Sequence, residues 1–250
     1  MIFYFSGTGN SKHVAQRLAQ ATGENCISIA DCINQHEFSF SLHENERIGL
    51  VTPVYFWGLP NIVVRFVNKL KFCNLHQNFI YHVITFGTTT GEAHYMMQKL
   101  LKGRGLWLDA KYNVKMVDVW TPMFDVSNRE KCLRKTQEAE KRISKITKMA
   151  VARKVGNYDY LRLPHWLAHG YYLTYDYQRK TNNFYVLKDK CIDCNKCALQ
   201  CPEHAIECKE GYPVWVKERC TLCLKCLHHC PQFAIQYGKR TIKHGQFVHP

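Results

Sequence analysis

Eight cysteines toward the C-terminal end have the spacing that most clearly specifies chemistry. The pattern C-x2-C-x2-C-x3-C-P occurs twice, at residues 191–202 (the first run) and at residues 220–231 (the second run). This pattern binds [4Fe–4S] clusters: three close thiolates hold one cube, and the fourth, directed away, holds the other. Zinc is the alternative, but it has no use for a third cysteine in both copies. We therefore predict two clusters, the first on Cys191, Cys194, Cys197 and Cys230 and the second on Cys201, Cys220, Cys223 and Cys226.

The repeat extends beyond these ligands. Residues 188–191 (KDKC) match residues 217–220 (KERC), and residues 201–206 (CPEHAI) match residues 230–235 (CPQFAI). Each half is predicted to hold a short strand, a cluster loop, a short helix and a return strand. The segment closely resembles a dicluster ferredoxin, which implies a small α+β domain. With little room for an apolar core, the clusters should supply much of its folding energy.

A second candidate site lies near the N-terminal end. The apolar residues 1–5 lead into a Gly- and hydroxyl-rich loop, and apolar residues at helical spacing follow it. A loop at the start of a helix offers backbone amides to a phosphate. The pattern is neither a Walker A loop nor the dinucleotide fingerprint, although an ordinary strand-to-helix turn is an alternative. It resembles the flavodoxin phosphate loop, which implies that FMN is bound by Ser6, Gly7, Thr8, Gly9, Asn10 and Ser11.

The elements that must position this loop alternate along residues 1–153. Alternation of strands and helices indicates a doubly wound parallel α/β sheet. The flavodoxin-like resemblance implies five strands in the order 2-1-3-4-5, with ligands outside the C-terminal strand ends. Strands are predicted at residues 1–5, 26–30, 48–52, 79–86 and 114–120, and helices at residues 12–19, 61–70, 93–101 and 128–153.

Two further loops follow predicted strands and match the flavin loops of flavodoxins. One is aromatic, and planar aromatic side chains stack on a planar flavin, although packing within the protein is an alternative role. The other loop, residues 85–91, lacks the stacking Tyr that many flavodoxins have there, and the next tyrosine is Tyr95. We therefore expect one face of the flavin to be either open or covered by the second domain. The resemblance implies FMN contacts from Pro53, Val54, Tyr55, Phe56, Trp57 and Gly58, and from Thr85, Phe86, Gly87, Thr88, Thr89 and Gly91.

The segment between the two halves is unusually aromatic. It is not the Gly/Ser-rich or charged sequence of a flexible linker. We predict an ordered strap that packs between the domains; an aromatic electron relay is the weaker alternative. The predicted division is a flavodoxin-like domain at residues 1–153, the strap at residues 154–183 and the ferredoxin domain at residues 184–250.

Composition narrows the function further. The formal charge of +14 falls to about +8 when two clusters (roughly −4) and a flavin phosphate (roughly −2) are counted. This favours partners with an acidic docking surface, whereas flavodoxins are typically acidic and have other partners. The basic residues form no aromatic-studded stripe, so nucleic acid is not expected.

No apolar stretch reaches the ~18 residues that span a bilayer. Cluster thiolates require a reducing compartment, hence the cytoplasm. The other cysteines should be inert: Cys26, Cys32, Cys73, Cys132 and Cys208.

Together the two halves resemble the EFR1-type fused flavodoxin–ferredoxin proteins of anaerobic bacteria and archaea. The resemblance implies electron transfer between two [4Fe–4S] clusters and FMN, with a redox partner protein. The alternative is an FMN-dependent reductase of a small acceptor, such as a quinone or a nitro compound, fed by its own ferredoxin domain. His82, His94 and Tyr95 are candidate proton donors for it by nearness to a flavin loop. The sequence leaves open whether the chain is an enzyme in its own right, and it specifies no oligomeric state.

Overall fold

A parallel sheet forms the centre of the N-terminal part of the chain in the computed structural model, which describes residues 1–160 and 163–250. The strand order β2-β1-β4-β6-β7-β8 contains the predicted flavodoxin-like order 2-1-3-4-5, with the two-residue β8 added at one edge. Two further short strands, β3 and β5, pair with each other outside this sheet. The strands are β1 (Ile2–Tyr4), β2 (Cys26–Ser28), β3 (Ser39–Ser41), β4 (Ile48–Pro53), β5 (Lys71–Cys73), β6 (Ile80–Phe86), β7 (Ala110–Lys115) and β8 (Gly156–Asn157).

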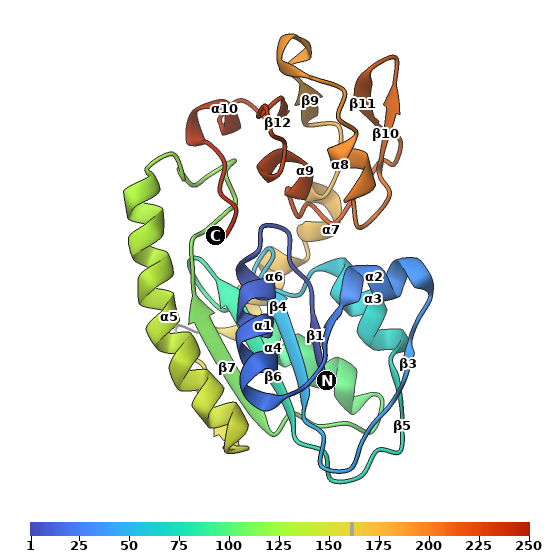
Figure 1. Ribbon diagram of the computed structural model, residues 1–250, viewed down its shortest axis with the longest axis vertical. Helices are drawn as coiled ribbons and strands as arrows, with labels where there is room; N and C mark the ends of the chain where they lie inside the picture. Colours follow the sequence, from blue (N-terminus) through green and yellow to red (C-terminus); the bar gives the residue numbers. More distant parts are fainter. Residues whose placement is uncertain (161–162) are drawn as a thin grey trace.

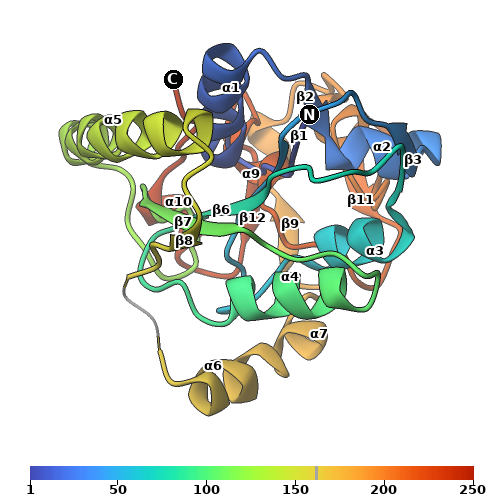
Figure 2. The ribbon, with the colours of Figure 1, turned by 90° about the horizontal axis from the view of Figure 1, so that it is seen from below.

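Helices cover both faces of the sheet (Figure 2). One apolar core lies between α1, α5 and side chains such as Val51 and Tyr112. A second core lies between α2, α3, α4 and the opposite face, with Phe3 and Leu50 at its centre. Both faces are therefore buried, as a doubly wound sheet requires. The helices are α1 (Asn10–Thr22), α2 (Ile29–Gln35), α3 (Asn61–Lys69), α4 (Ala93–Lys102) and α5 (Arg129–Val151).

Two sequence-based strand boundaries were wrong. The strand predicted at residues 26–30 ends at Ser28, which caps α2 by accepting a 3.3 Å hydrogen bond from the Asp31 amide. The last strand, predicted at residues 114–120, is β7 at Ala110–Lys115 instead. Its register with β6 ends where Phe86 pairs with Lys115, so the residues after it have no strand to pair with and form a loop.

The C-terminal part is a small α+β domain that lies above the carboxyl ends of the sheet strands (Figure 1). Strand β9 pairs antiparallel with β12, and β10 pairs antiparallel with β11. Each cysteine run contains a one-turn helix and is followed by a return strand, in agreement with the predicted repeat. The elements are β9 (Phe184–Val186), the 3-10 turn η1 (Lys188–Lys190), α8 (Lys196–Leu199), β10 (Ile206–Lys209), β11 (Tyr212–Trp215), α9 (Lys225–His228), β12 (Ile235–Tyr237) and α10 (Thr241–His244).

Two short helices connect the domains, α6 (His165–Tyr172) and α7 (Tyr175–Gln178). Helix α6 begins directly after Pro164 and runs beside α4 (Figure 2). The predicted strap packs on both sides: Tyr172 donates a 2.8 Å hydrogen bond to the Leu59 carbonyl, and Tyr175 donates one of 2.8 Å to Thr221 in the second run. Within the described residues, no helix has the length and apolarity to cross a membrane.

Candidate flavin and cluster sites

The phosphate loop, residues 6–11, leads from β1 into α1 and is tied to two other loops. Ser11 shares a 2.8 Å hydrogen bond with the hydroxyl of Thr85, and the Asn10 amide donates one of 3.1 Å to the Val117 carbonyl. The Ser6 hydroxyl accepts a 3.1 Å bond from the Gly9 amide. Because Asn10 and Ser11 are committed to neighbouring loops, backbone amides with Ser6 and Thr8 are the groups that remain for a phosphate.

The phosphate loop opens into a central cavity of about 410 Å³. That volume is within the roughly 300–1,000 Å³ of small-molecule and cofactor sites. All three predicted loops contribute, so the residues present fit an FMN molecule. The predicted residues that line the cavity are Ser6, Gly7, Thr8, Asn10, Ser11, Pro53, Val54, Tyr55, Phe56, Trp57, Thr85, Phe86, Gly87, Thr88 and Thr89.

Three predicted glycines, Gly9, Gly58 and Gly91, are not among the lining residues and instead shape the loops. Gly91 has φ +54°, and a Cβ there would lie 2.0 Å from the Trp57 carbonyl oxygen. Gly58 closes a tight turn with Tyr55 through two backbone hydrogen bonds of 2.9 Å. These residues allow the loops to approach each other and have no direct contact with the cavity.

The turn at residues 55–58 is conformationally strained. Phe56 and Trp57 have φ values of 48° and 63°, a region that bulky residues rarely occupy. The two aromatic rings are held by the strap: Phe56 lies 5.0 Å from Tyr175 and Trp57 lies 4.4 Å from Tyr171, centroid to centroid. Strain of about 1–3 kcal/mol per residue persists only where the surroundings impose it, and it is frequent at ligand sites.

Sequence reasoning missed several residues that line the central cavity. The loop after β7, expected to be strand, supplies a partly buried carboxyl group: burial raises the pKa of Asp118, while a 3.1 Å hydrogen bond from the Trp120 amide lowers it. The signal that could have found this loop is the general position of ligands at the carboxyl ends of parallel strands. The missed residues are Val117, Asp118, Val119, Trp120, Met123, Phe124, Leu163, Tyr171, Leu222, Cys223 and Leu224.

The structure places the eight cysteines in two groups. One cavity is lined by Cys191, Cys194, Cys197 and Cys230. Cys201 lies instead among the cysteines of the second run, where its charge contributes to raising their pKa values. Burial is the main cause: it raises the pKa of Cys220 and Cys223 to about 12 and holds that of Cys226 well above its ordinary value. Buried thiols of this kind become thiolates when a metal binds them, so the donor set fits iron–sulfur clusters.

Cys208, expected to be inert, lines the cavity of the first run. It shares a side-chain hydrogen bond with Cys197. It comes from β10, the return strand of the first half, and the second half has Tyr237 at the equivalent position. The first cluster site is therefore bordered by a fifth cysteine that the ligand pattern does not include.

The second run lies directly on the phosphate loop. Leu222, Cys223 and Leu224 line the central cavity, and a Cβ on Gly7 would be 2.4 Å from the Cys223 carbonyl oxygen. His229 in the same run donates a 3.2 Å hydrogen bond to the Gly7 carbonyl when its Nε2 is protonated. The second domain and Tyr171 thus contribute to the wall of the cavity together with the loop that lacks a stacking Tyr.

A family model described as a flavodoxin domain matches residues 1–144. The chain belongs to the flavodoxin domain family. A second model, described as a 4Fe-4S binding domain, matches residues 184–207, which include the first run. The flavodoxin domain implies FMN, the 4Fe-4S domain implies a [4Fe–4S] cluster, and the eight cysteines fit two. The protein is a flavin and iron–sulfur electron-transfer protein with a ferredoxin-like domain after its flavodoxin domain.

Solved structures resemble the flavodoxin domain only distantly. A flavodoxin from Streptococcus pneumonia TIGR4 is 16% identical with a TM-score of 0.38, and the match covers 62% of this chain and 97% of that one. The Trp repressor binding protein from Bacillus subtilis is 13% identical with a TM-score of 0.35, covering 59% and 96%. Among curated proteins, none matches this chain. Likenesses this distant say nothing about function.

The flavodoxin domain places the three candidate proton donors away from the central cavity. His82 and His94 are buried and hydrogen-bonded to each other through their Nδ1 atoms at 2.9 Å. His82 also bonds the Thr52 hydroxyl at 2.9 Å, and burial lowers its pKa well below the usual value. Tyr95 is exposed and its ring lies 4.2 Å from His165. None of the three lines the cavity.

Proposed function

We propose that the protein is an EFR1-type fusion that passes electrons between two [4Fe–4S] clusters and FMN. Each cluster exchanges one electron and FMN one or two, so the fusion would trade single electrons for pairs. The observation that carries the proposal is the shared wall of the central cavity. Leu222, Cys223 and Leu224 of the second run border it together with the phosphate loop. A small ferredoxin that diffuses freely would have no need of such a contact.

The ligand assignment proposed is the crossed one. Cys201, Cys220, Cys223 and Cys226 would hold the cluster beside the flavin, and Cys191, Cys194, Cys197 and Cys230 the outer one. The residues of the three loops named above would hold FMN. Around it, the apolar side chains of Leu222 and Leu224, both 3% exposed, exclude water, and a water-excluded site strengthens the electrostatic interactions inside it.

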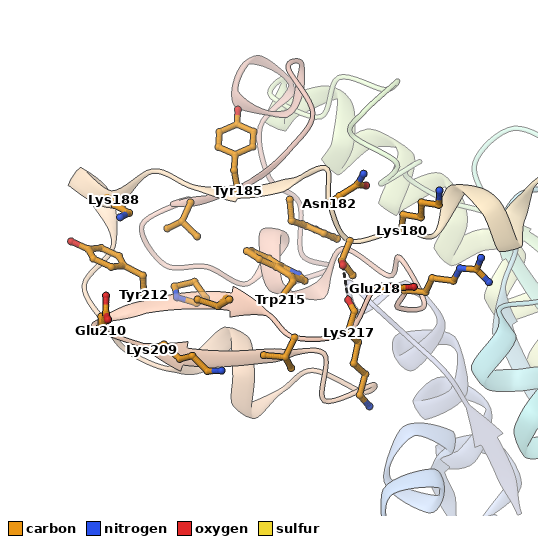
Figure 3. Close-up of a pocket in the computed structure, with 17 residues that line it drawn as sticks. Lys180, Asn182, Tyr185, Lys188, Lys209, Glu210, Tyr212, Trp215, Lys217 and Glu218 are labelled. Atoms are coloured by element: carbon orange, nitrogen blue, oxygen red, sulfur yellow. Dashed lines mark hydrogen bonds between the residues drawn. The ribbon is translucent and has the colours of Figure 1, made fainter.

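The partner would dock beside the outer cluster. A groove of about 1010 Å³ runs between β9 and β11, and Pro213 lines both this groove and the cavity of the first run. Figure 3 shows lysines at both ends of the groove around Tyr185, Tyr212 and Trp215. Lys180, Lys188, Lys209, Lys217 and Arg219 outnumber Glu210 and Glu218 in its lining. This excess supports an acidic docking surface on the partner, because opposite charge steers association.

Reconstitution under anaerobic conditions tests the proposal. Iron, sulfide and FMN should give about eight irons and one FMN per chain. A one-electron reductant should then reduce clusters and flavin in one coupled process, followed at their separate wavelengths. Cys223→Ala should uncouple the flavin, whereas Cys194→Ala, in the outer site, should leave the second cluster coupled to it. Stoichiometric zinc, or no bound flavin at saturating FMN, would refute the proposal.

Charge reversal tests the docking groove. Lys188→Glu with Lys209→Glu should slow electron transfer from an acidic ferredoxin-type donor at low ionic strength, and the difference should shrink as salt screens it. Lys145→Glu with Lys148→Glu, two exposed lysines on α5 of the flavodoxin domain, is the matched control. An equal effect of both charge changes would place the docking surface elsewhere. A reducing compartment such as the cytoplasm suits the free thiols that the clusters need.

One observation favours a second candidate, an FMN-dependent reductase of a small acceptor. Asp118 lies in the wall of the central cavity, and burial raises its pKa above the ordinary value, which is the direction that favours a carboxyl group as a proton donor. Asp118→Asn should then abolish turnover of a quinone or nitro acceptor while FMN still binds. Unchanged turnover, or none in the wild-type protein, leaves the carrier as the function.

A further inference from the structure

Three side chains outside the flavin and cluster sites converge on one point between α6 and α4. His165 and His169 are four residues apart on α6 and therefore lie on one face of it. Glu92 precedes α4, and its side chain is only 2% exposed. One Glu92 carboxylate oxygen lies 3.0 Å from His165 Nε2 and the other 3.1 Å from His169 Nδ1. One ligand atom from each residue lies within 4.8 Å of the others.

These separations suit a metal ion. Zinc binds imidazole nitrogen and carboxylate oxygen at about 2.0–2.2 Å, and tetrahedral bonds of that length place ligand atoms roughly 3.3 Å apart. Two histidines and one glutamate are a known three-residue zinc set with a fourth position left to water. Both histidines are about half exposed, at 49% and 52%, so an ion can reach the site from solvent.

We propose that Glu92, His165 and His169 form a zinc-class divalent metal site that fastens the strap to the flavodoxin domain.

The surroundings of Glu92 favour a metal ion over a simple pair of His–Glu contacts. A buried carboxylate needs a cationic partner, and no Lys or Arg forms an ion pair with Glu92 in the part of the chain that the structure describes. The chain offers a contrasting cluster, His13, Glu140 and His249. There the carboxylate is more exposed and already has Arg17 at 3.7 Å. The group of Glu92, His165 and His169 therefore has the greater need for an added positive charge.

The site lies one hydrogen bond from the aromatic loop. The Glu92 amide donates a 2.7 Å hydrogen bond to the Trp57 carbonyl. On the same helix as the two histidines, Tyr171 packs on Trp57 and Tyr172 bonds the Leu59 carbonyl. A metal ion would therefore fix the helix that holds the strained aromatic turn in position. The proposal does not depend on electron transfer, because it concerns how the strap is attached.

Zinc titration of the holo-protein, with its cysteines occupied by iron, tests the site. Calorimetry with Zn²⁺ should find one site per chain, and zinc X-ray absorption should show nitrogen and oxygen ligands without sulfur. His165→Gln and His169→Gln should each weaken binding by more than roughly 100-fold, beyond the loss typical of outer-shell changes. Zinc should raise the unfolding temperature of the wild-type protein and leave that of the two variants unchanged.

Two matched variants make the assignment decisive. His76→Gln, an exposed histidine elsewhere in the flavodoxin domain, should bind zinc as the wild type does. His13→Gln tests the contrasting cluster and should also bind normally. Zinc binding that survives His165→Gln with His169→Gln, that disappears in His13→Gln, or that the wild-type protein lacks at millimolar Zn²⁺ would overturn the proposal. Circular dichroism of each variant confirms that it is folded.

Discussion

The two cysteine runs share one backbone and have different surroundings. Three positions with positive φ match between the two halves. In the first half they are of types that adopt this conformation most readily; in the second they are bulky and apolar. The matched pairs are Asp193 and Leu222, Asn195 and Leu224, and His204 and Phe233.

Contact with the flavodoxin domain explains the two leucines of the second half. Asp193 and Asn195 face solvent, whereas Leu222 and Leu224 are buried against the central cavity. A bulky residue with positive φ costs about 1–3 kcal/mol, and burial of a leucine side chain contributes about 1.5–3 kcal/mol. The ligand pattern sets the backbone of each half, and the neighbouring domain sets which side chains that backbone carries.

The largest effect should come from replacing the fourth cysteine of each run by alanine. Cys201→Ala should remove the second cluster and Cys230→Ala the first, because each cysteine lies with the other run. Both variants should fall from about eight irons to about four. Only Cys201→Ala should also uncouple the flavin from the remaining cluster. Iron analysis and flavin reduction measured on one sample check this, and the opposite pattern would refute the crossed pairing.

A smaller effect should distinguish the one-turn helices of the two halves, namely how much the free energy of unfolding falls when a leucine in each is shortened. Leu227 in α9 is 0% exposed and Leu199 in α8 is 82% exposed. Leu227→Ala should lower the free energy of unfolding by about 2–5 kcal/mol, and Leu199→Ala should change it by less than about 0.5 kcal/mol. Denaturant unfolding of the holo-protein under anaerobic conditions measures both. Equal losses would mean that the halves are buried alike.

The smallest expected effect is a pH dependence of stability that arises from His82 in the sheet of the flavodoxin domain. It serves as a reference because it does not involve either half of the ferredoxin domain. His82 is neutral in the folded state because burial holds its pKa well below the usual value. The unfolded chain binds a proton below pH ~6.5 that the folded chain does not, so stability is lost as pH falls through that value. The slope is at most about 1.4 kcal/mol per pH unit.

His82→Gln should remove this part of the slope between pH 7 and pH 5.5. Unfolding of the flavodoxin domain, followed by circular dichroism at each pH, measures it. Cluster absorbance in native conditions should respond equally to pH in the variant and the wild type. A variant whose unfolding slope equals that of the wild type would show that His82 does not titrate on unfolding.

The sequence predicts those features that local chemistry dictates. Cysteine spacing, the Gly- and hydroxyl-rich loop and helical periodicity all act within a few residues, so the turn from β1 into α1 and the helices α3, α4 and α5 lie close to where the sequence places them. The ends of β2 and β7 depend on partners instead. Val117 and Val119 have strand-like character, but β6 ends at Phe86 and offers them no hydrogen bonds. The C-terminal end of β7 is therefore determined by its pairing with β6 in the assembled sheet.

The cover over the central cavity could not be predicted for a similar reason. Leu222 and Leu224 resemble ordinary core residues of a ferredoxin domain, and nothing local indicates that they face another domain. Cys208 was expected to be inert because it lies outside the ligand pattern. The metal site joins Glu92 to two histidines more than 70 residues away. The cover of the cavity and the Glu92 contacts depend on how the strap packs, whereas the Cys197–Cys208 contact forms within the ferredoxin domain.

The approach of the Cys223 carbonyl to Gly7 has a consequence for the two cofactors as ligands. One backbone segment borders both sites, so occupation of either can change the affinity of the other. Thermodynamic reciprocity then requires equal factors in both directions: whatever iron in the second run does to FMN affinity, FMN does to iron affinity. The supply of flavin would thereby influence the affinity of the protein for the cluster of the second run, and the supply of iron would influence its affinity for flavin.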